Sequence, residues 1–100
     1  MLSYAEYKML GGDLEAAAYD RVVYGVMRNI DLFTFGRASK LTPMPEAVKR
    51  LIVAMCAVAA PYNTDTDDEC RKHQYRLAQA YLSDVRTADG VPLLYRGTDK

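Results

Sequence analysis

The sequence predicts an all-α protein, a small bundle of three to four helices with a long central helix and an extended C-terminal arm. Apolar residues recur every three or four positions along most of the chain, which is the period of a helix buried on one face. Ser or Thr followed three residues later by Glu occurs twice, a spacing typical of a capped helix start. Glycines and prolines interrupt the pattern between these segments. We therefore expect one helical domain over residues 1–90 and an arm over residues 91–100.

The first two helices are separated by a glycine pair. Ser3 and Glu6 predict a short helix that ends before Gly11 and Gly12. Asp13 is then expected to cap a second helix, whose length of some 20 residues at about 1.5 Å each would span roughly 30 Å. We expect this helix to be the spine of the fold, with an apolar stripe made of Leu14, Ala18, Val22, Val26, Ile30 and Phe33.

The third helix, over about residues 45–60, is apolar on nearly every face and is expected to be the most buried. Its core side comprises Val48, Leu51, Ile52, Met55, Cys56 and Ala59. Thr66 and Glu69 predict the start of a fourth helix that runs to about Thr87, with Arg86 near its C-terminal end. Its expected face comprises Leu77, Tyr81 and Val85, with Gln74, Ala78 and Leu82 beside it.

Composition restricts the classes of function. The chain has 13 Lys and Arg residues against 13 Asp and Glu residues, so no net charge attracts it to nucleic acid or to an acidic membrane. No segment approaches the roughly 20 apolar residues of a membrane span, and none resembles a secretory signal, so we expect an intracellular, soluble chain. Cys56 and Cys70 fit neither a disulfide framework nor a zinc motif, which predicts reduced and at least partly buried thiols.

Neither a catalytic residue, a metal nor a cofactor is expected. His73, the only histidine, lies three residues from Cys70, and two ligands are too few for a structural zinc site. The acidic residues of 65–69 begin like a calcium loop, but its sixth and twelfth positions hold Cys70 and Arg76 in place of Gly and Glu. We interpret these acids as favourable charges at a helix N-terminus.

A basic patch follows on the fourth helix, made of Arg71, Lys72, His73 and Arg76. The chain lacks the short turn and recognition helix of a DNA reader, so a solvated or subunit-facing patch is favoured. A small helical nucleic-acid-binding regulator is the alternative function, and a metal-dependent enzyme using Cys70 and His73 is a third. The acidic start beside the basic turns suits head-to-tail packing of subunits into a ring.

Eight tyrosines and no tryptophan make the aromatic content unusual. One thin core is not expected to accommodate all of Tyr4, Tyr7, Tyr24, Tyr62 and Tyr75. Because tyrosine combines an apolar ring with a hydroxyl that tolerates a wet rim, we expect some of these residues at subunit contacts.

The C-terminal segment has no obvious partner within the sequence. Pro92 lacks a backbone donor and favours an extended Val91, while Gly90 is typical of a helix stop. An apolar and aromatic run follows, made of Leu93, Leu94 and Tyr95. We expect another subunit to receive it if its own chain does not.

Four short motifs occur in a distinctive order. They are Tyr4, Glu6 and Tyr7 leading into Gly11-Gly12; the end of the long helix in Ile30-Asp31 and Thr34-Phe35-Gly36-Arg37; Pro45-Glu46-Ala47-Val48-Lys49; and Leu93-Leu94-Tyr95-Arg96-Gly97. Together they resemble the small head-tail connector (adaptor, head-completion) proteins of tailed phages and prophages. The resemblance covers nearly the whole chain, although the segment over residues 61–68 is short and acidic where relatives have a longer loop containing Ser and Gly.

The resemblance implies a helical, non-enzymatic virion protein. Members of this family form a homo-oligomeric ring, commonly a dodecamer, beneath the portal protein, where they extend the DNA channel and receive a downstream neck or tail-completion protein. DNA would pass through without sequence-specific binding, and no membrane would be involved. The location implied is the neck of the virion, after assembly in the host cytoplasm.

Interface residues are also implied by this resemblance. They are Phe35, Arg37, Leu93, Leu94, Tyr95 and Arg96. Gly36 would permit a backbone angle closed to larger residues, and Arg37 would cap the long helix or pair across subunits. The arm of Leu93 to Arg96 would dock on a neighbouring subunit or on the portal, by strand addition.

Overall fold

The computed structural model describes residues 2–38, 44–61, 68–86, 90 and 92–94. It contains α1 (Tyr4–Met9), α2 (Ala16–Thr34), α3 (Glu46–Ala59) and α4 (Asp68–Leu82). Among the described residues the only β-type pairing is an isolated antiparallel bridge between Arg86 and Pro92. The predicted all-α bundle with a long central helix is confirmed. None of the helices in the described ranges has the length and apolar character that a membrane span requires.

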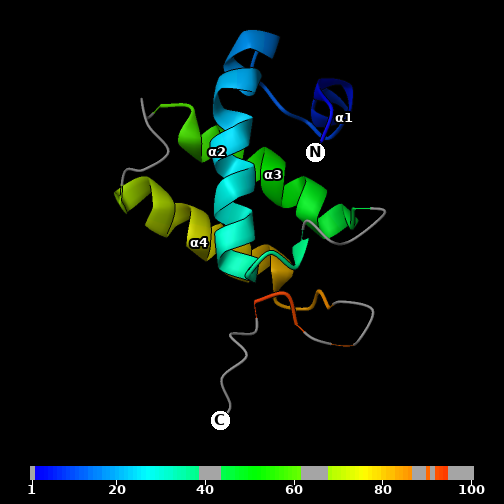
Figure 1. The fold of residues 1–100 in the computed structure, drawn as a ribbon. Helices are drawn as coiled ribbons and strands as arrows, with labels where there is room; N and C mark the ends of the chain where they lie inside the picture. Colours follow the sequence, from blue (N-terminus) through cyan, green and yellow to red (C-terminus); the bar gives the residue numbers. More distant parts are fainter. Residues whose placement is uncertain (1, 39–43, 62–67, 87–89, 91, 95–100) are drawn as a thin grey trace.

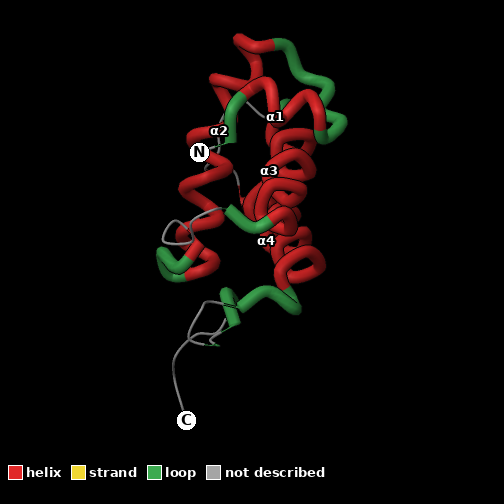
Figure 2. Tube along the Cα trace, turned by 90° about the vertical axis from the view of Figure 1, so that its right-hand side faces the viewer, coloured by secondary structure: helices red, strands yellow, loops and turns green. Residues whose placement is uncertain are grey.

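The helices form two layers. α3 and α4 run antiparallel to each other and α2 crosses both of them (Figure 1). Turned by 90°, the molecule shows α2 on one side of this pair and α1 at the end where α2 begins (Figure 2). α3 packs against both α2 and α4, and the six residues predicted for its core side are all buried, which confirms that prediction.

Tyrosine side chains hold α1 against α2. The Tyr7 and Tyr19 rings stack with centroids 4.4 Å apart, and Tyr4 contacts both. The Tyr4 hydroxyl donates to the Leu14 carbonyl (2.9 Å), and the Tyr7 hydroxyl accepts from the Leu14 amide (3.0 Å). A Cβ on Gly12 would lie only 2.2 Å from the Tyr7 ring, so this ring requires glycine there. Tyr7 is thus one of the tyrosines that the core accommodates.

The start of α1 follows the predicted cap in part. The Ser3 hydroxyl accepts a hydrogen bond from the Glu6 amide at 3.2 Å, as the capping spacing predicts. The Glu6 carboxylate instead pairs with the Lys49 ammonium at 2.9 Å and so links α1 to α3.

Two helix boundaries differ from the predicted ones. α2 begins at Ala16 with Glu15 at the N-cap, so Asp13 does not cap it. α4 ends at Leu82, five residues before the predicted Thr87, because the chain turns there: the Val85 amide donates to the Leu82 carbonyl. Arg86 therefore lies beyond the helix and donates to the Gly90 carbonyl at 3.1 Å. The predicted cap Thr66 lies outside the described residues.

The buried face of α4 also differs from the predicted one. It comprises Cys70, Gln74, Ala78 and Leu82, whereas Tyr81 is 40% exposed. Gln74 is tolerated inside because its side-chain oxygen accepts from the Asn29 amide of α2 at 2.9 Å, and its own amide donates to Cys70 Sγ at 3.1 Å. A polar pair thus lies between α2 and α4.

Both cysteines are buried and neither forms a disulfide, as the sequence predicts. Burial raises the pKa of the Cys56 thiol from 9.0 to about 12. Burial, with smaller contributions from Cys56 and Tyr7, raises the pKa of Tyr19 from 10.0 to about 12. These groups stay neutral in the folded protein at pH values where the unfolded chain ionises.

We predict that the free energy of unfolding is flat up to about pH 9 and falls as the pH rises from there towards 12. The folded state holds protons that the unfolded state has released, so each such group contributes a slope of at most about 1.4 kcal/mol per pH unit. Urea unfolding followed by circular dichroism, in reductant, measures this slope. Cys56→Ala should lower stability at every pH yet fall less steeply above pH 9; an unchanged slope would contradict the assignment to Cys56.

Candidate partner-binding surface

α2 ends in a tight turn that carries an exposed aromatic ring. Phe35 adopts the left-handed conformation (φ 55°) and Gly36 follows with φ 77°. The Gly36 amide donates to the Asp31 carbonyl at 2.8 Å and the Phe35 amide to that of Leu32 at 3.4 Å, the paired bonds of a Schellman motif. Glycine usually occupies the position that Phe35 has here, because the left-handed conformation strains the backbone of other residues. Phe35 is also 55% exposed.

Arg37 fastens the C-terminal segment to this turn. Its guanidinium donates to the carbonyls of Pro92 (3.1 Å) and Leu93 (3.2 Å), and lies 5.5 Å from the centroid of the Phe35 ring. On the other side of the segment, the Leu93 amide donates to the Val85 carbonyl at 3.0 Å. The Nη1 atom of Arg37 thus holds the C-terminal segment of its own chain.

The chain itself receives Leu93. This side chain is 0% exposed and belongs to the same core cluster as α2, α3 and α4. The expectation that another subunit must bury it is therefore wrong for Leu93, because Arg37 and Val85 hold the segment where the side chain can enter the core. Leu94 is only partly buried, and Tyr95 and Arg96 lie outside the described residues.

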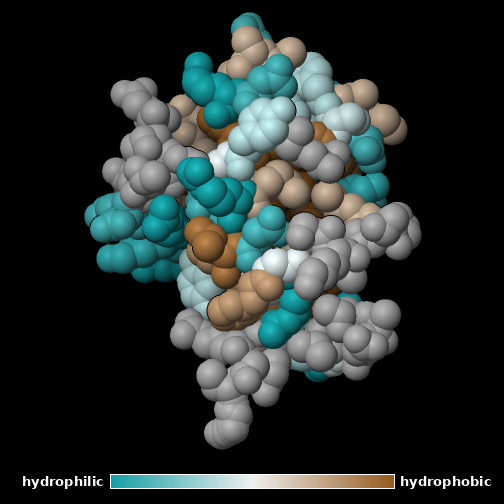
Figure 3. All heavy atoms as spheres, in the orientation of Figure 1, coloured by the Kyte–Doolittle hydropathy of each residue, from teal (hydrophilic) through white to brown (hydrophobic). Residues whose placement is uncertain are grey.

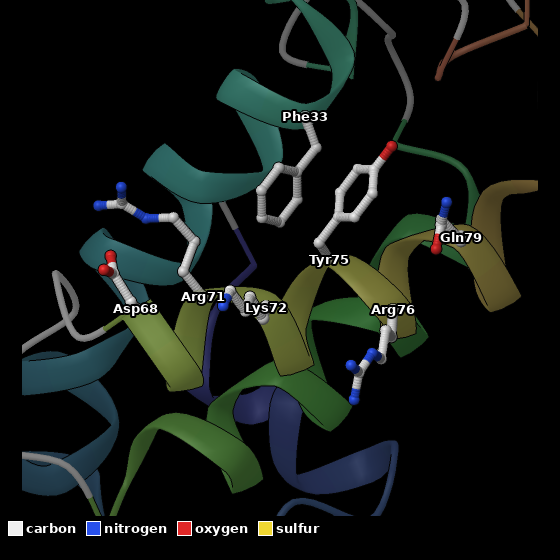
Figure 4. Close-up of a pocket in the computed structure, with 7 residues that line it drawn as sticks. All are labelled: Phe33, Asp68, Arg71, Lys72, Tyr75, Arg76 and Gln79. Carbon is white, nitrogen blue, oxygen red and sulfur yellow. The ribbon is translucent and has the colours of Figure 1, made fainter.

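A groove runs between the end of α2 and the outer face of α4. Its larger part, of about 630 Å³, is lined by Phe33, Asp68, Arg71, Lys72, Tyr75, Arg76 and Gln79. Phe33 and Tyr75 project from the two helices towards each other, and their rings meet edge to face with centroids 5.0 Å apart (Figure 4). Asp68 and Arg71 lie on one side of these rings and Arg76 and Gln79 on the other (Figure 4).

A smaller hollow of about 220 Å³ continues the groove. Phe33 and Tyr75 belong to both parts, and the remaining wall is Leu32, Phe35 and Leu94. Leu32 is 57% exposed, so this end is an apolar strip at the surface. In the space-filling view hydrophobic side chains gather over the end of α2, with hydrophilic ones over the first half of α4 (Figure 3). The surface therefore joins an apolar strip to a charged groove.

The structure brings together part of the predicted interface. Phe35 and Leu94, 59 positions apart in the sequence, share the apolar strip, and Arg37 lies behind it as a positioning residue. Sequence reasoning found the cations of α4 but missed the aromatic floor, because Phe33 was assigned to the core stripe of α2. His73 is exposed and does not line the groove. Tyr24 is 67% exposed on α2, and Tyr62 lies outside the described residues.

Neither a metal site nor a known relative identifies this surface. Within the described ranges no group of three or more His, Cys, Asp or Glu residues could hold a metal ion. No family model, no curated protein and no solved structure matches the chain.

We predict that Leu93→Ala lowers the free energy of unfolding by about 2–4 kcal/mol, since it removes a fully buried side chain. The matched control Leu94→Ala should cost less than about 1.5 kcal/mol, because Leu94 is only partly buried. Urea denaturation of both variants measures the difference. Equal and small losses would show that the segment does not pack on its own chain.

Replacing Phe35 separates backbone strain from loss of the ring. Phe35→Gly and Phe35→Ala both remove the aromatic contact, but only glycine adopts a positive φ without strain. The Gly variant should therefore be more stable than the Ala variant by about 1 kcal/mol. Thermal and urea unfolding provide the comparison, and an Ala variant as stable as the Gly variant would show that the backbone at this position is not left-handed.

Proposed function

We propose that the chain is a head-tail connector of a tailed phage or prophage: a non-enzymatic virion protein that forms a ring beneath the portal, extends the DNA channel and receives the next neck or tail component. The ordered motifs, from Tyr4 to Gly97, are the primary support. The ring, its copy number of commonly twelve, and the location in the virion neck come with this family and are part of the proposal.

The observation that best supports the proposal is the apolar strip around Phe35. A strained, exposed ring lies in the motif over residues 34–37, beside Leu94 of the C-terminal motif. Exposed apolar surface next to charged side chains is the usual composition of a protein interface. The described residues near it offer no metal cluster and no histidine that would favour catalysis instead.

We predict that the chain, mixed with the portal protein of the same phage or prophage, forms a ring on the portal that electron microscopy of the purified complex resolves. The paired substitution Leu32→Asp with Phe35→Asp places two charges in the apolar strip and should abolish this ring. Tyr24→Asp, at an aromatic residue outside the groove that is more exposed than Phe35, is the control and should leave the ring intact.

Two outcomes would contradict the connector. One is a chain that never binds the portal and is dispensable for joining tails to heads. The other is tight DNA binding that weakens steeply with salt, which would favour the nucleic-acid-binding regulator acting through Arg71, Lys72 and Arg76.

A further inference from the structure

The groove holds cations that outnumber the acidic side chains lining it among the described residues. Arg71, Lys72 and Arg76 line it against a single carboxylate, that of Asp68. The ion pairs formed within the described ranges, Lys49 with Glu6 and Arg50 with Glu46, lie on other helices. The Nε atom of Arg71 is buried and has no hydrogen-bond acceptor there. A buried donor without an acceptor costs free energy, and negative charge placed beside this guanidinium would offset part of that cost.

The ligand that fits combines carboxylates with apolar atoms. Carboxylates would meet the three cations, while the aromatic floor of Phe33 and Tyr75 would contact apolar atoms. The chain itself carries such a segment, since four of the five residues over 65–69 are acidic. Of these, Asp68 and Glu69 are exposed in the first turn of α4, and neither forms an ion pair within the part of the chain that the structure describes.

We propose that the acidic segment over residues 65–69 of one subunit, which includes Asp68 and Glu69 in the first turn of α4, docks in the basic groove of the next subunit. The proposal deepens the connector function and rests on it for the ring. One helix then supplies both halves of a head-to-tail contact, with the acidic end and Arg76 eight residues apart, about 12 Å along the helix. The apolar strip of Leu32, Phe35 and Leu94 lies beside the groove and enlarges the buried area.

The distribution of charge favours a second copy of this chain over nucleic acid as the ligand of the groove. A subunit with no net charge that carries an acidic segment next to a basic groove is electrostatically complementary to a second copy of itself. The span from Arg71 to Arg76 is only about 7.5 Å of helix, enough for few phosphates, whereas DNA-binding proteins commonly make 6–10 phosphate contacts.

Charge reversal on the two surfaces provides the test. The groove variant carries Lys72→Glu and Arg76→Glu, and the acidic-end variant carries Asp67→Lys and Glu69→Lys. At low salt, self-association of each variant alone should weaken at least tenfold relative to the unsubstituted chain, measured by sedimentation velocity. Lys8→Glu with Arg21→Glu reverses two exposed cations away from the groove and should change nothing.

Mixing the two variants makes the test specific. Each pair retains one unsubstituted groove and one unsubstituted acidic end, so the mixture should form a heterodimer and no larger species. A chain carrying all four substitutions should regain self-association, which also shows that the reversals do not unfold the protein. In NMR spectra, amide shifts of the groove residues should move with concentration up to about 1 mM, the range of weak contacts.

Three results would overturn the docking. They are groove amides that do not shift up to about 1 mM, variants that associate as the unsubstituted chain does, and a mixture without heterodimers. A portal-bound ring that still forms with the groove variant would refute the docking and leave the connector function standing. Heterodimers from a chain that never binds a portal would establish the docking and refute the connector.

Discussion

The burial of α3 is the constraint on which the rest of the fold depends. Its sequence leaves little polar surface, so it must be covered on more than one side, and α2 and α4 provide the cover. Where the two covering helices meet, Asn29 and Gln74 form a buried hydrogen bond and Phe33 meets Tyr75 at the surface. Because a misplaced crossing would leave these amides unpaired, the polar pair fixes the geometry at which the groove opens.

The C-terminal segment also lines that groove, next to the place where α2 crosses α4. α2 must end at Thr34 for Arg37 to reach the carbonyls of Pro92 and Leu93. Once those carbonyls are held, Leu93 enters the core and Leu94 remains at the rim beside Phe35. One arginine thus connects the end of the central helix, the last core side chain and the apolar strip. Its charge is used inside the subunit, which leaves the cations of α4 as the groove's positive charges.

Burial that follows from the pattern of one helix could be predicted from the sequence. Burial that depends on a residue far away in the sequence could not. The core face of α3 was predicted in full because its pattern leaves few alternatives. The buried face of α4 was not, since Gln74 is acceptable inside only when Asn29 of another helix pairs with it. Burial of Leu93 likewise depends on Arg37, 56 positions earlier. The cations of the groove could be predicted, but its aromatic floor required the crossing of two helices.

Phe35 lowers the stability of the single subunit but provides an apolar ring for a binding surface. A left-handed phenylalanine costs the subunit of the order of 1–2 kcal/mol that glycine would not, and more than half of the residue is left in water. Within the described ranges, the contact of the ring with the Arg37 guanidinium and the two hydrogen bonds of the Schellman motif offset part of this cost. An exposed apolar ring on a strained backbone is explained better by a surface that covers it than by folding, and apolar burial there would supply affinity while the charges of the groove fix the register.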